Sequence, residues 1–239
     1  MRIVAISDLH ADASTLGVSR FNEIEAAVSA SVETAQRRSA DLFIFAGDLA
    51  DPESAGATFR AIELAQHTAL KLARAGIPSV WLTGNHCVVD DGSGESVLSP
   101  LRALAKHEPK IMVADRPAVV PFGAIRLMLF PFTAIARAYD PAKWCTENWP
   151  VSRDVVTVSH LTVAGIVPGE ETTEMPRGRE VLFPTAETSK AKARIQGHYH
   201  RAQDFDPGDG GPPIHVIGSL CRLTFGEEHH RPSIFVLDV

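Results

Sequence analysis

The sequence predicts an α/β layered fold, and two observations support this. Strand-like and helix-like segments alternate through the first half, and short apolar runs separated by Pro- and Gly-containing turns fill the second half. The 239 residues, 45% apolar and 22% charged, suffice for one large domain or two small ones with a proper core. We expect a single domain over residues 1–239, since no internal repeat is visible.

The first half predicts three buried strands, each an apolar run that ends in polar residues. They cover Arg2–Ser7, Asp41–Asp48 and the run "PSVWL" before Gly84. Three helices are expected over Phe21–Ala40, Ala55–Ala75 and Ser96–His107. Gly76 and Pro78 stop the second helix, and Ser96 or Ser93 is expected to cap the third.

The second half predicts the strands of a second sheet. The runs are "KIMVA", "IRLMLFPF", "VVTVSHL", "RIQGHYH", "PIHVIGS" and "SIFVLDV". Residues Gly165–Pro184 are polar with several turn formers, which predicts a long loop near a site. Residues Asp206–Pro213, "DPGDGGPP", are interpreted as a turn of little chemical interest.

Composition excludes several classes of protein. No apolar run approaches the roughly 20 residues of a membrane span, and the N-terminus is typical of a first strand rather than a signal peptide. Three distant cysteines without a CxxC pattern favour a reduced, cytoplasmic setting. The net charge of −6 argues against coating nucleic acid by charge alone, but bound divalent cations would change the local sign in an enzyme acting on phosphates.

Polar residues gather where the predicted strands end, which is where ligands bind in α/β sheets. They are Asp8, His10, Asp48, Asn85, His86, His160, His198 and His200. Any one of them has an ordinary explanation, such as a helix cap or a turn. Together they would be costly to bury unless paired or bound to metal. Carboxylate, imidazole and amide ligands suit Mn²⁺, Fe, Zn²⁺ or Co²⁺, and so many ligands suit two ions that share a bridging carboxylate.

The blocks "DLH", "GDLAD", "GNH", a later His and "GHYH" resemble, in order and type, the five signature blocks of calcineurin-like metallophosphoesterases. The resemblance implies a four-layer αββα sandwich of two mixed β-sheets flanked by helices, with a dinuclear site between the sheets. It implies that one ion binds Asp8, His10 and His200, that the other binds Asn85, His160 and His198, and that Asp48 bridges them. His86 would contact the phosphate and protonate the leaving oxygen; alternatively, it only orients Asn85.

Within that family, "GHYHRAQ", "VSHLTVAGIVPGEETTE", "IGSLCRLTFGEEHH" and "SIFVLDV" resemble segments of the Mre11/SbcD nucleases. This implies a Mn²⁺-dependent exo- or endonuclease acting on DNA ends, in which a metal-bridging hydroxide attacks the phosphodiester. Arg177, Arg179, Arg201 and Arg222 are candidate phosphate contacts.

The chain also departs from that branch. Ala50 and Asp51 stand where these nucleases often carry a His, and Cys87, expected to be buried, replaces the usual Asp. The capping domain and the segment that binds a Rad50/SbcC-type ATPase are expected to be absent. Two alternatives stay open: a phosphodiesterase or phosphatase on a small phosphoester, and a metal-bound, non-catalytic scaffold. The first two predicted helices could form a homodimer face or simply pack on their own sheet.

Overall fold

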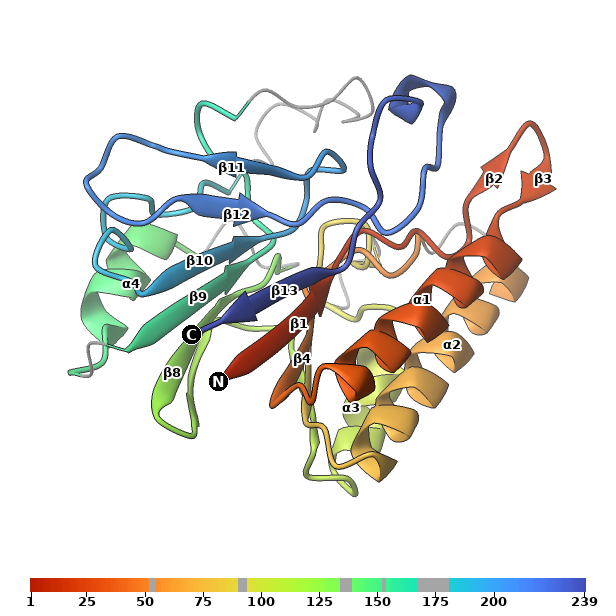
Figure 1. Ribbon diagram of the computed structural model, residues 1–239, viewed down its shortest axis with the longest axis horizontal. Coiled ribbons are helices and arrows are strands. Elements are labelled where there is room, and N and C mark those ends of the chain that lie inside the picture. Colours follow the sequence, from red (N-terminus) through yellow and green to blue (C-terminus); the bar gives the residue numbers. More distant parts are fainter. Residues whose placement is uncertain (52–54, 90–93, 134–138, 152–153, 167–180) are drawn as a thin grey trace.

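Two mixed β-sheets lie face to face, with helices on their outer sides (Figure 1). The computed structural model describes residues 1–51, 55–89, 94–133, 139–151, 154–166 and 181–239. Three helices cover the outer side of one sheet, and a fourth lies on the outer side of the other. This is the predicted order of layers, helix–sheet–sheet–helix, so the α/β sandwich prediction is confirmed.

The first sheet has the strand order β13-β1-β4-β5-β6. These strands cover β13 (Phe235–Asp238), β1 (Arg2–Ile6), β4 (Leu42–Phe45), β5 (Ser79–Leu82) and β6 (Ile111–Ala114). The four strands from β1 to β6 run parallel, and β13 pairs antiparallel with β1. Both ends of the chain therefore lie side by side in this sheet, and the Met1 amino group donates to the Val239 carbonyl over 2.9 Å.

The second sheet has the strand order β11-β12-β10-β9-β8-β7. These strands cover β11 (Gln203–Phe205), β12 (Ile214–Val216), β10 (Ala193–Gln196), β9 (Val155–Ser159), β8 (Ile125–Phe130) and β7 (Ala118–Phe122). Its four inner strands are parallel, and the outer strands β7 and β11 are antiparallel to their neighbours. A small hairpin of β2 (Ser14–Thr15) and β3 (Val18–Ser19) stands apart from both sheets.

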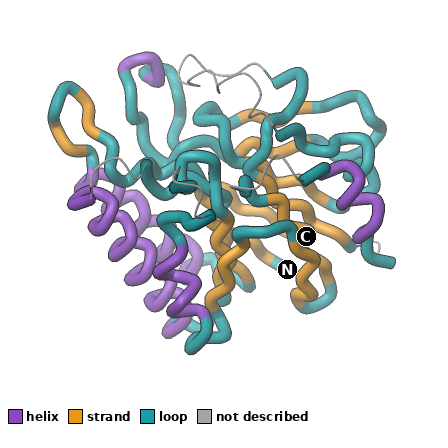
Figure 2. The backbone as a smooth tube through the Cα atoms, turned by 180° about the vertical axis from the view of Figure 1, so that it is seen from behind, coloured by secondary structure: helices purple, strands orange, loops and turns teal. Residues whose placement is uncertain are grey.

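The helices that cover the first sheet are gathered on one side of the molecule, as Figure 2 shows from behind. They are α1 (Phe21–Arg37), α2 (Ala55–Arg74) and α3 (Ser99–Ala105), with α4 (Pro141–Asn148) on the opposite flank and the 3-10 turn η2 (Phe225–Glu227) near the C-terminus. Among the described residues, no helix is both long and apolar enough to cross a membrane.

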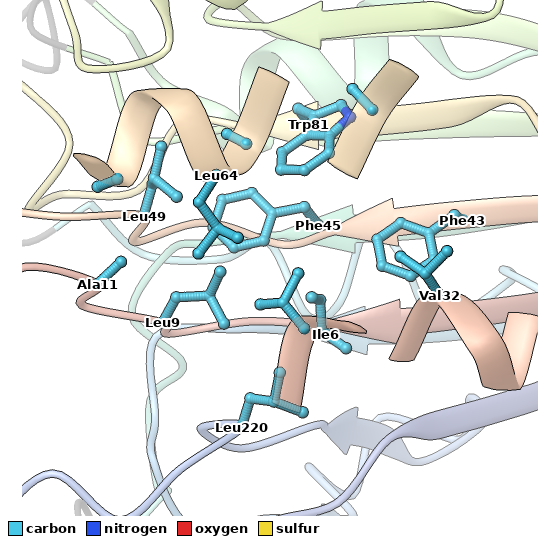
Figure 3. Close-up of a cluster of buried hydrophobic side chains, with 14 of the residues drawn as sticks. Ile6, Leu9, Ala11, Val32, Phe43, Phe45, Leu49, Leu64, Trp81 and Leu220 are labelled. Carbon is cyan, nitrogen blue, oxygen red and sulfur yellow. The ribbon is translucent and has the colours of Figure 1, made fainter. Parts of the chain in front are cut away.

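Alternation of side chains along the strands separates two layers of the core. In β1, Val4 and Ile6 face the helices while Ile3 and Ala5 face the second sheet. Phe45 of β4 and Trp81 of β5 stack on the helix side, with ring centroids 5.2 Å apart (Figure 3). Because the first sheet is covered on both faces, its central strand β4 is apolar and buried throughout, as is typical of parallel sheets.

The prediction that all six second-half runs form the second sheet was wrong for two of them. Ile111–Ala114 and Phe235–Asp238 join the edges of the first sheet instead. An apolar run shows that a strand is buried, but its pairing partner depends on contacts with distant segments. β7 escaped prediction because Pro121 interrupts it, which an edge strand tolerates.

The capping prediction for α3 was also wrong. The helix begins at Ser99 after Leu98, and the Ser96 hydroxyl accepts from the Leu98 N–H in the preceding turn. Ser93, the other proposed cap, lies outside the described residues, as do residues 167–180 of the predicted long loop. Arg177 and Arg179 fall in that gap, so their proposed phosphate contacts stay predictions.

The segment interpreted as an unimportant turn holds a buried ion pair. Arg194 of β10 is fully buried, and its guanidinium donates to both carboxylate oxygens of Asp209 over 2.5 and 3.1 Å. It also donates to the carbonyl oxygens of Thr185 and Pro212. The turn therefore supplies the anionic partner of a buried charge that would be very costly without one.

Candidate metal centre

The eight predicted site residues lie at the carboxyl ends of parallel strands from both sheets. β1 leads to Asp8 and His10, β4 to Asp48, and β5 to Asn85 and His86. In the second sheet, β9 leads to His160, and β10 leads to His198 and His200. Because the carboxyl ends of parallel strands meet at one edge, segments far apart in the sequence converge there.

One group of side chains joins the two sheets through Asp8, His10 and His200. Their possible ligand atoms all lie within 4.8 Å of one another. His10 Nε2 and His200 Nε2 are 3.2 Å apart, and the Asp8 side chain is fully buried. We call these three residues the first group.

A second group comprises Asp48, His160 and His198, whose possible ligand atoms also lie within 4.8 Å of one another. Asn85 belongs with them, since its Oδ1 is 3.0 Å from His198 Nδ1 and 3.2 Å from His160 Nε2. We call these four residues the second group.

Asp48 lies between the two groups. Its Oδ2 is 2.9 Å from His160 Nε2 in the second group and 3.9 Å from His10 Nε2 in the first. Its Oδ1 accepts from the His86 backbone N–H over 2.9 Å. One carboxylate oxygen thus faces both groups, which is the placement that a bridging ligand needs.

The chemistry of the donor set fits divalent cations. Both carboxylate oxygens of Asp8 are buried and have no hydrogen-bond partner, although burying an unpaired carboxylate is very costly. Two imidazole nitrogens also face each other across the first group. A cation held between them and Asp8 would satisfy all of these atoms at once, and donors of this kind suit Mn²⁺, Fe, Zn²⁺ or Co²⁺.

The backbone is unusual where it carries these side chains. Of the six described non-glycine residues with positive φ, four are the site residues Asp8, His10, Asp48 and His198. This conformation costs energy in residues with a side chain, and it concentrates at functional sites, where surrounding structure holds it in place.

Glycines next to these residues make room for close approach, and sequence reasoning gave them no role. A Cβ on Gly84 would lie 2.1 Å from Asp48 Oδ1, and a Cβ on Gly47 would lie 2.1 Å from His160 Nδ1. On Gly197 it would lie 2.4 Å from the Ala46 carbonyl. A side chain on Gly47 or Gly197 would push strand ends of the two sheets apart, and one on Gly84 would displace the Asp48 carboxylate within the first sheet.

His86 is more accessible than the neighbouring histidines His10 and His200. Its side chain is 35% exposed, against 14% for His200 and 10% for His10. Its Nδ1 forms a short hydrogen bond with Asp51 Oδ1, and the other Asp51 oxygen is 3.2 Å from His10 Nδ1. Asp51, noted in the sequence only as a departure, therefore contacts two of the predicted site residues.

Charge balance shifts the pKa values in this cluster. Burial alone would lower the pKa of His86, but its hydrogen bond to Asp51 and the nearby charges of Asp48 and Asp51 raise it to about 9. Burial would raise the pKa of Asp48, but the charge and hydrogen bond of His160 hold it far below its usual range. Burial and the neighbouring His160 charge lower the pKa of His198 to about 3, which keeps that ring a free base.

Glu227 is a further residue that sequence reasoning did not single out. It is fully buried, and its Oε1 lies 2.7 Å from His200 Nδ1. The stretch "FGE" was noted in the sequence only as part of a resemblance. No local signal relates it to His200, because 27 residues separate the two.

Other predicted residues lie outside the cluster. Cys87 is fully buried and its Sγ accepts from the Leu49 N–H at 3.2 Å, which confirms the prediction of burial. Arg201 and Arg222 are exposed, and Arg222 donates to the His230 carbonyl. Their proposed phosphate contacts stay predictions.

Comparison with known proteins identifies relatives of this chain. A family model described as calcineurin-like phosphoesterase matches residues 1–202. The SbcD component of the SbcCD nuclease of Escherichia coli K12 is 26% identical over 253 aligned residues, which cover 95% of this chain and 62% of that protein. The same component from Escherichia coli O157:H7 gives the same values. The chain thus spans about three-fifths of the length of these curated relatives.

Solved structures share the fold. A dimetal phosphatase from Danio rerio superposes with a TM-score of 0.56 at 13% identity, covering 92% of this chain and 87% of that one. Another crystal structure gives a TM-score of 0.57 at 12% identity over 99% of this chain and 98% of its own. At such low identity the likeness establishes the fold alone.

Proposed function

The chain belongs to the calcineurin-like phosphoesterase family, and on that basis we propose that it is a two-metal phosphodiesterase that hydrolyses DNA as an exo- or endonuclease. The observation that carries the proposal is the meeting of the two groups around Asp48. The first group would hold one divalent ion and the second group the other, with Asp48 between them. Mn²⁺ is our first choice, and Fe, Zn²⁺ and Co²⁺ fit the same donors.

The bound ions would polarise the phosphate and supply a water-derived nucleophile at neutral pH. Protonation of the leaving oxygen would fall to residues of the chain itself. His86 presents the ring nitrogen that Asp51 does not contact, and its partly exposed side chain can reach a phosphoester over the site. In this role His86 protonates the leaving oxygen, and Asp51 holds the ring at a fixed angle.

DNA is the proposed substrate because of the similarity to SbcD of the SbcCD nuclease, which covers 95% of this chain. We propose that residues 1–239 form one nuclease-core domain, since β13 returns to pair with β1. A Rad50/SbcC-type ATPase partner is a further proposal, which rests on the similarity to SbcD of the SbcCD nuclease, and a homodimer is another.

A small phosphodiester or phosphomonoester is the second candidate substrate. The net charge of −6 gives no general attraction for DNA, and Asp51 adds a negative charge beside His86 where the resembling nucleases often carry a His. The fold is also shared with a dimetal phosphatase. A small substrate would need few contacts outside the cluster, so negative charge on the surrounding protein would repel it less than it would repel a long polyanion.

Hydrolysis in the presence of Mn²⁺ tests the proposal with two substrates side by side, end-labelled linear DNA and bis-p-nitrophenyl phosphate. We expect both to be cleaved, and both activities to be lost in His86→Ala. Cleavage of the small diester alone would favour the second candidate. No cleavage of either substrate by a protein that binds two metal ions would favour a non-catalytic scaffold.

A further inference from the structure

We infer that Glu227 is a positioning residue that holds His200 for the ion of the first group, so that occupancy of this group depends on the C-terminal segment 217–230. The inference rests on the proposed function for its assumption that the first group binds metal. It concerns a part of the chain beyond residue 202, where the match to the family model ends.

The two nitrogens of the His200 ring have different partners. Nδ1 is 2.7 Å from Glu227 Oε1, and Nε2 is 3.2 Å from His10 Nε2. When Nδ1 donates its proton to the carboxylate, Nε2 carries the lone pair and points into the first group. A carboxylate in this position fixes both the tautomer and the rotation of a metal-binding histidine, and it raises the basicity of the ring.

Glu227 is itself held firmly. Its carboxylate is fully buried, and while one oxygen contacts His200, the other accepts from the Leu223 N–H. The backbone of Glu227 is held as well, since its carbonyl accepts from the His230 N–H over 2.8 Å. A buried carboxylate with a partner on each oxygen has little freedom to rotate, so it can define the position of the ring that it contacts.

The segment that carries Glu227 is anchored next to His200 and on the β2–β3 hairpin. The Ser219 N–H donates to the His200 carbonyl over 2.9 Å, and Ser219 forms a parallel bridge with Ser7, the residue before Asp8. The Thr15 hydroxyl donates to the Leu223 carbonyl over 2.8 Å. The loop that carries Glu227 to His200 is therefore held in place by hydrogen bonds at several positions.

The second group is held differently. The outer nitrogen of His160 lies 2.6 Å from the Ala46 backbone carbonyl, which no substitution of a side chain removes. Loss of the Glu227 charge should consequently weaken binding of the ion in the first group and leave binding of the ion in the second group unchanged. A residue with only a general structural role would not separate the two ions in this way.

The test compares Glu227→Gln and Glu227→Ala with Glu228→Gln. The affinity of the protein for each of the two Mn²⁺ ions is measured by isothermal titration calorimetry, and free Mn²⁺ is measured by electron paramagnetic resonance. Glu228 is a matched control, because it is the next carboxylate along the chain, is largely exposed and pairs with His229, which is also largely exposed. We expect wild type and Glu228→Gln to bind two ions. In Glu227→Gln, one ion should bind about 10–100-fold more weakly and the other as in wild type, with a larger loss in Glu227→Ala.

Circular dichroism of the metal-free proteins completes the design. Equal affinity for both ions in all variants would overturn the inference, as would equal weakening of both ions or loss of folded structure in Glu227→Gln. If wild type itself binds no metal, the proposed function fails, and this outcome is distinct from failure of the Glu227 inference alone.

Discussion

His160 contacts the loop after β4 through both of its ring nitrogens. Nε2 lies 2.9 Å from Asp48 Oδ2, and Nδ1 lies 2.6 Å from the Ala46 carbonyl. Asp48 follows β4 of the first sheet and His160 follows β9 of the second, so this pair ties the sheets together at the site. Gly47 lies between the two contacts, has φ of +111° and leaves no room for a Cβ.

Gly47→Ala should therefore lower both stability and metal binding. The new Cβ would meet the His160 ring, and the positive φ would add strain of about 1–3 kcal/mol. We expect a lower midpoint of urea unfolding and weaker Mn²⁺ binding. Gly56→Ala is the control, because nothing lies within 4 Å of its Cβ and it lies in α2, where Ala is the better helix former. Equal midpoints for the two variants would contradict the packing argument.

Asp48→Ala should remove bound metal. Its carboxylate is the one that faces both groups, so its loss leaves His10 and His160 without the anion between them. Elemental analysis after gel filtration in Mn²⁺ measures the expected drop from two ions per chain. Retention of both ions in a folded Asp48→Ala protein would exclude Asp48 as a bridging ligand.

His86→Ala should leave the metal content intact and lower kcat by about 10²–10⁴-fold, which is the usual contribution of a general acid. Its ring contacts Asp51 and lies at the exposed side of the cluster. Metal content and bis-p-nitrophenyl phosphate hydrolysis are measured on the same sample. Metal loss as large as that of Asp48→Ala would show that the residue supports the ions instead.

Asp51→Asn should reduce hydrolysis mainly through His86. If Asp51 acts by holding that ring, the double variant with His86→Ala should be no slower than His86→Ala alone at saturating Mn²⁺. Saturating metal is needed because Asp51 also contacts His10. If the double variant instead loses activity by the sum of the two single effects, expressed as free energies, Asp51 acts on the reaction independently of His86.

Asp209→Asn should destabilise the fold by about 3–5 kcal/mol near neutral pH, because it leaves the buried Arg194 without its anion. The hydrogen bond from Arg194 holds the pKa of Asp209 below its usual value. The stabilisation is consequently complete above the unfolded pKa of about 3.9 and is lost as the pH falls through the lower folded pKa.

Urea unfolding at neutral pH and at about pH 3 measures this difference between wild type and Asp209→Asn, which should shrink at the lower pH. Asp206→Asn serves as the control, since Asp206 is exposed in the same turn and accepts a hydrogen bond from the Gly208 N–H. A difference that grows as the pH falls would contradict the assignment of the stabilising charge to Asp209.

The sequence by itself determined the α/β class, the helices α1 and α2 almost to their ends, and the family. These features are local, because apolar periodicity and strand-end motifs depend only on residues that are close together in the sequence. The prediction that Asp8, Asp48, Asn85 and His198 meet also came from local motifs, because parallel strands bring their carboxyl ends to one edge. The structure places them together, while their role as ligands stays a prediction.

Only the tertiary structure decided which strands pair, and which residues support the site from a distance. β13 pairs with β1 across the whole length of the chain, Glu227 meets His200, and Asp209 meets the buried Arg194. The physical reason is the same in each case. A short segment shows whether a residue is apolar, charged or in a turn, but the partner of a buried charge or strand edge is selected by packing among segments that lie far apart in the sequence.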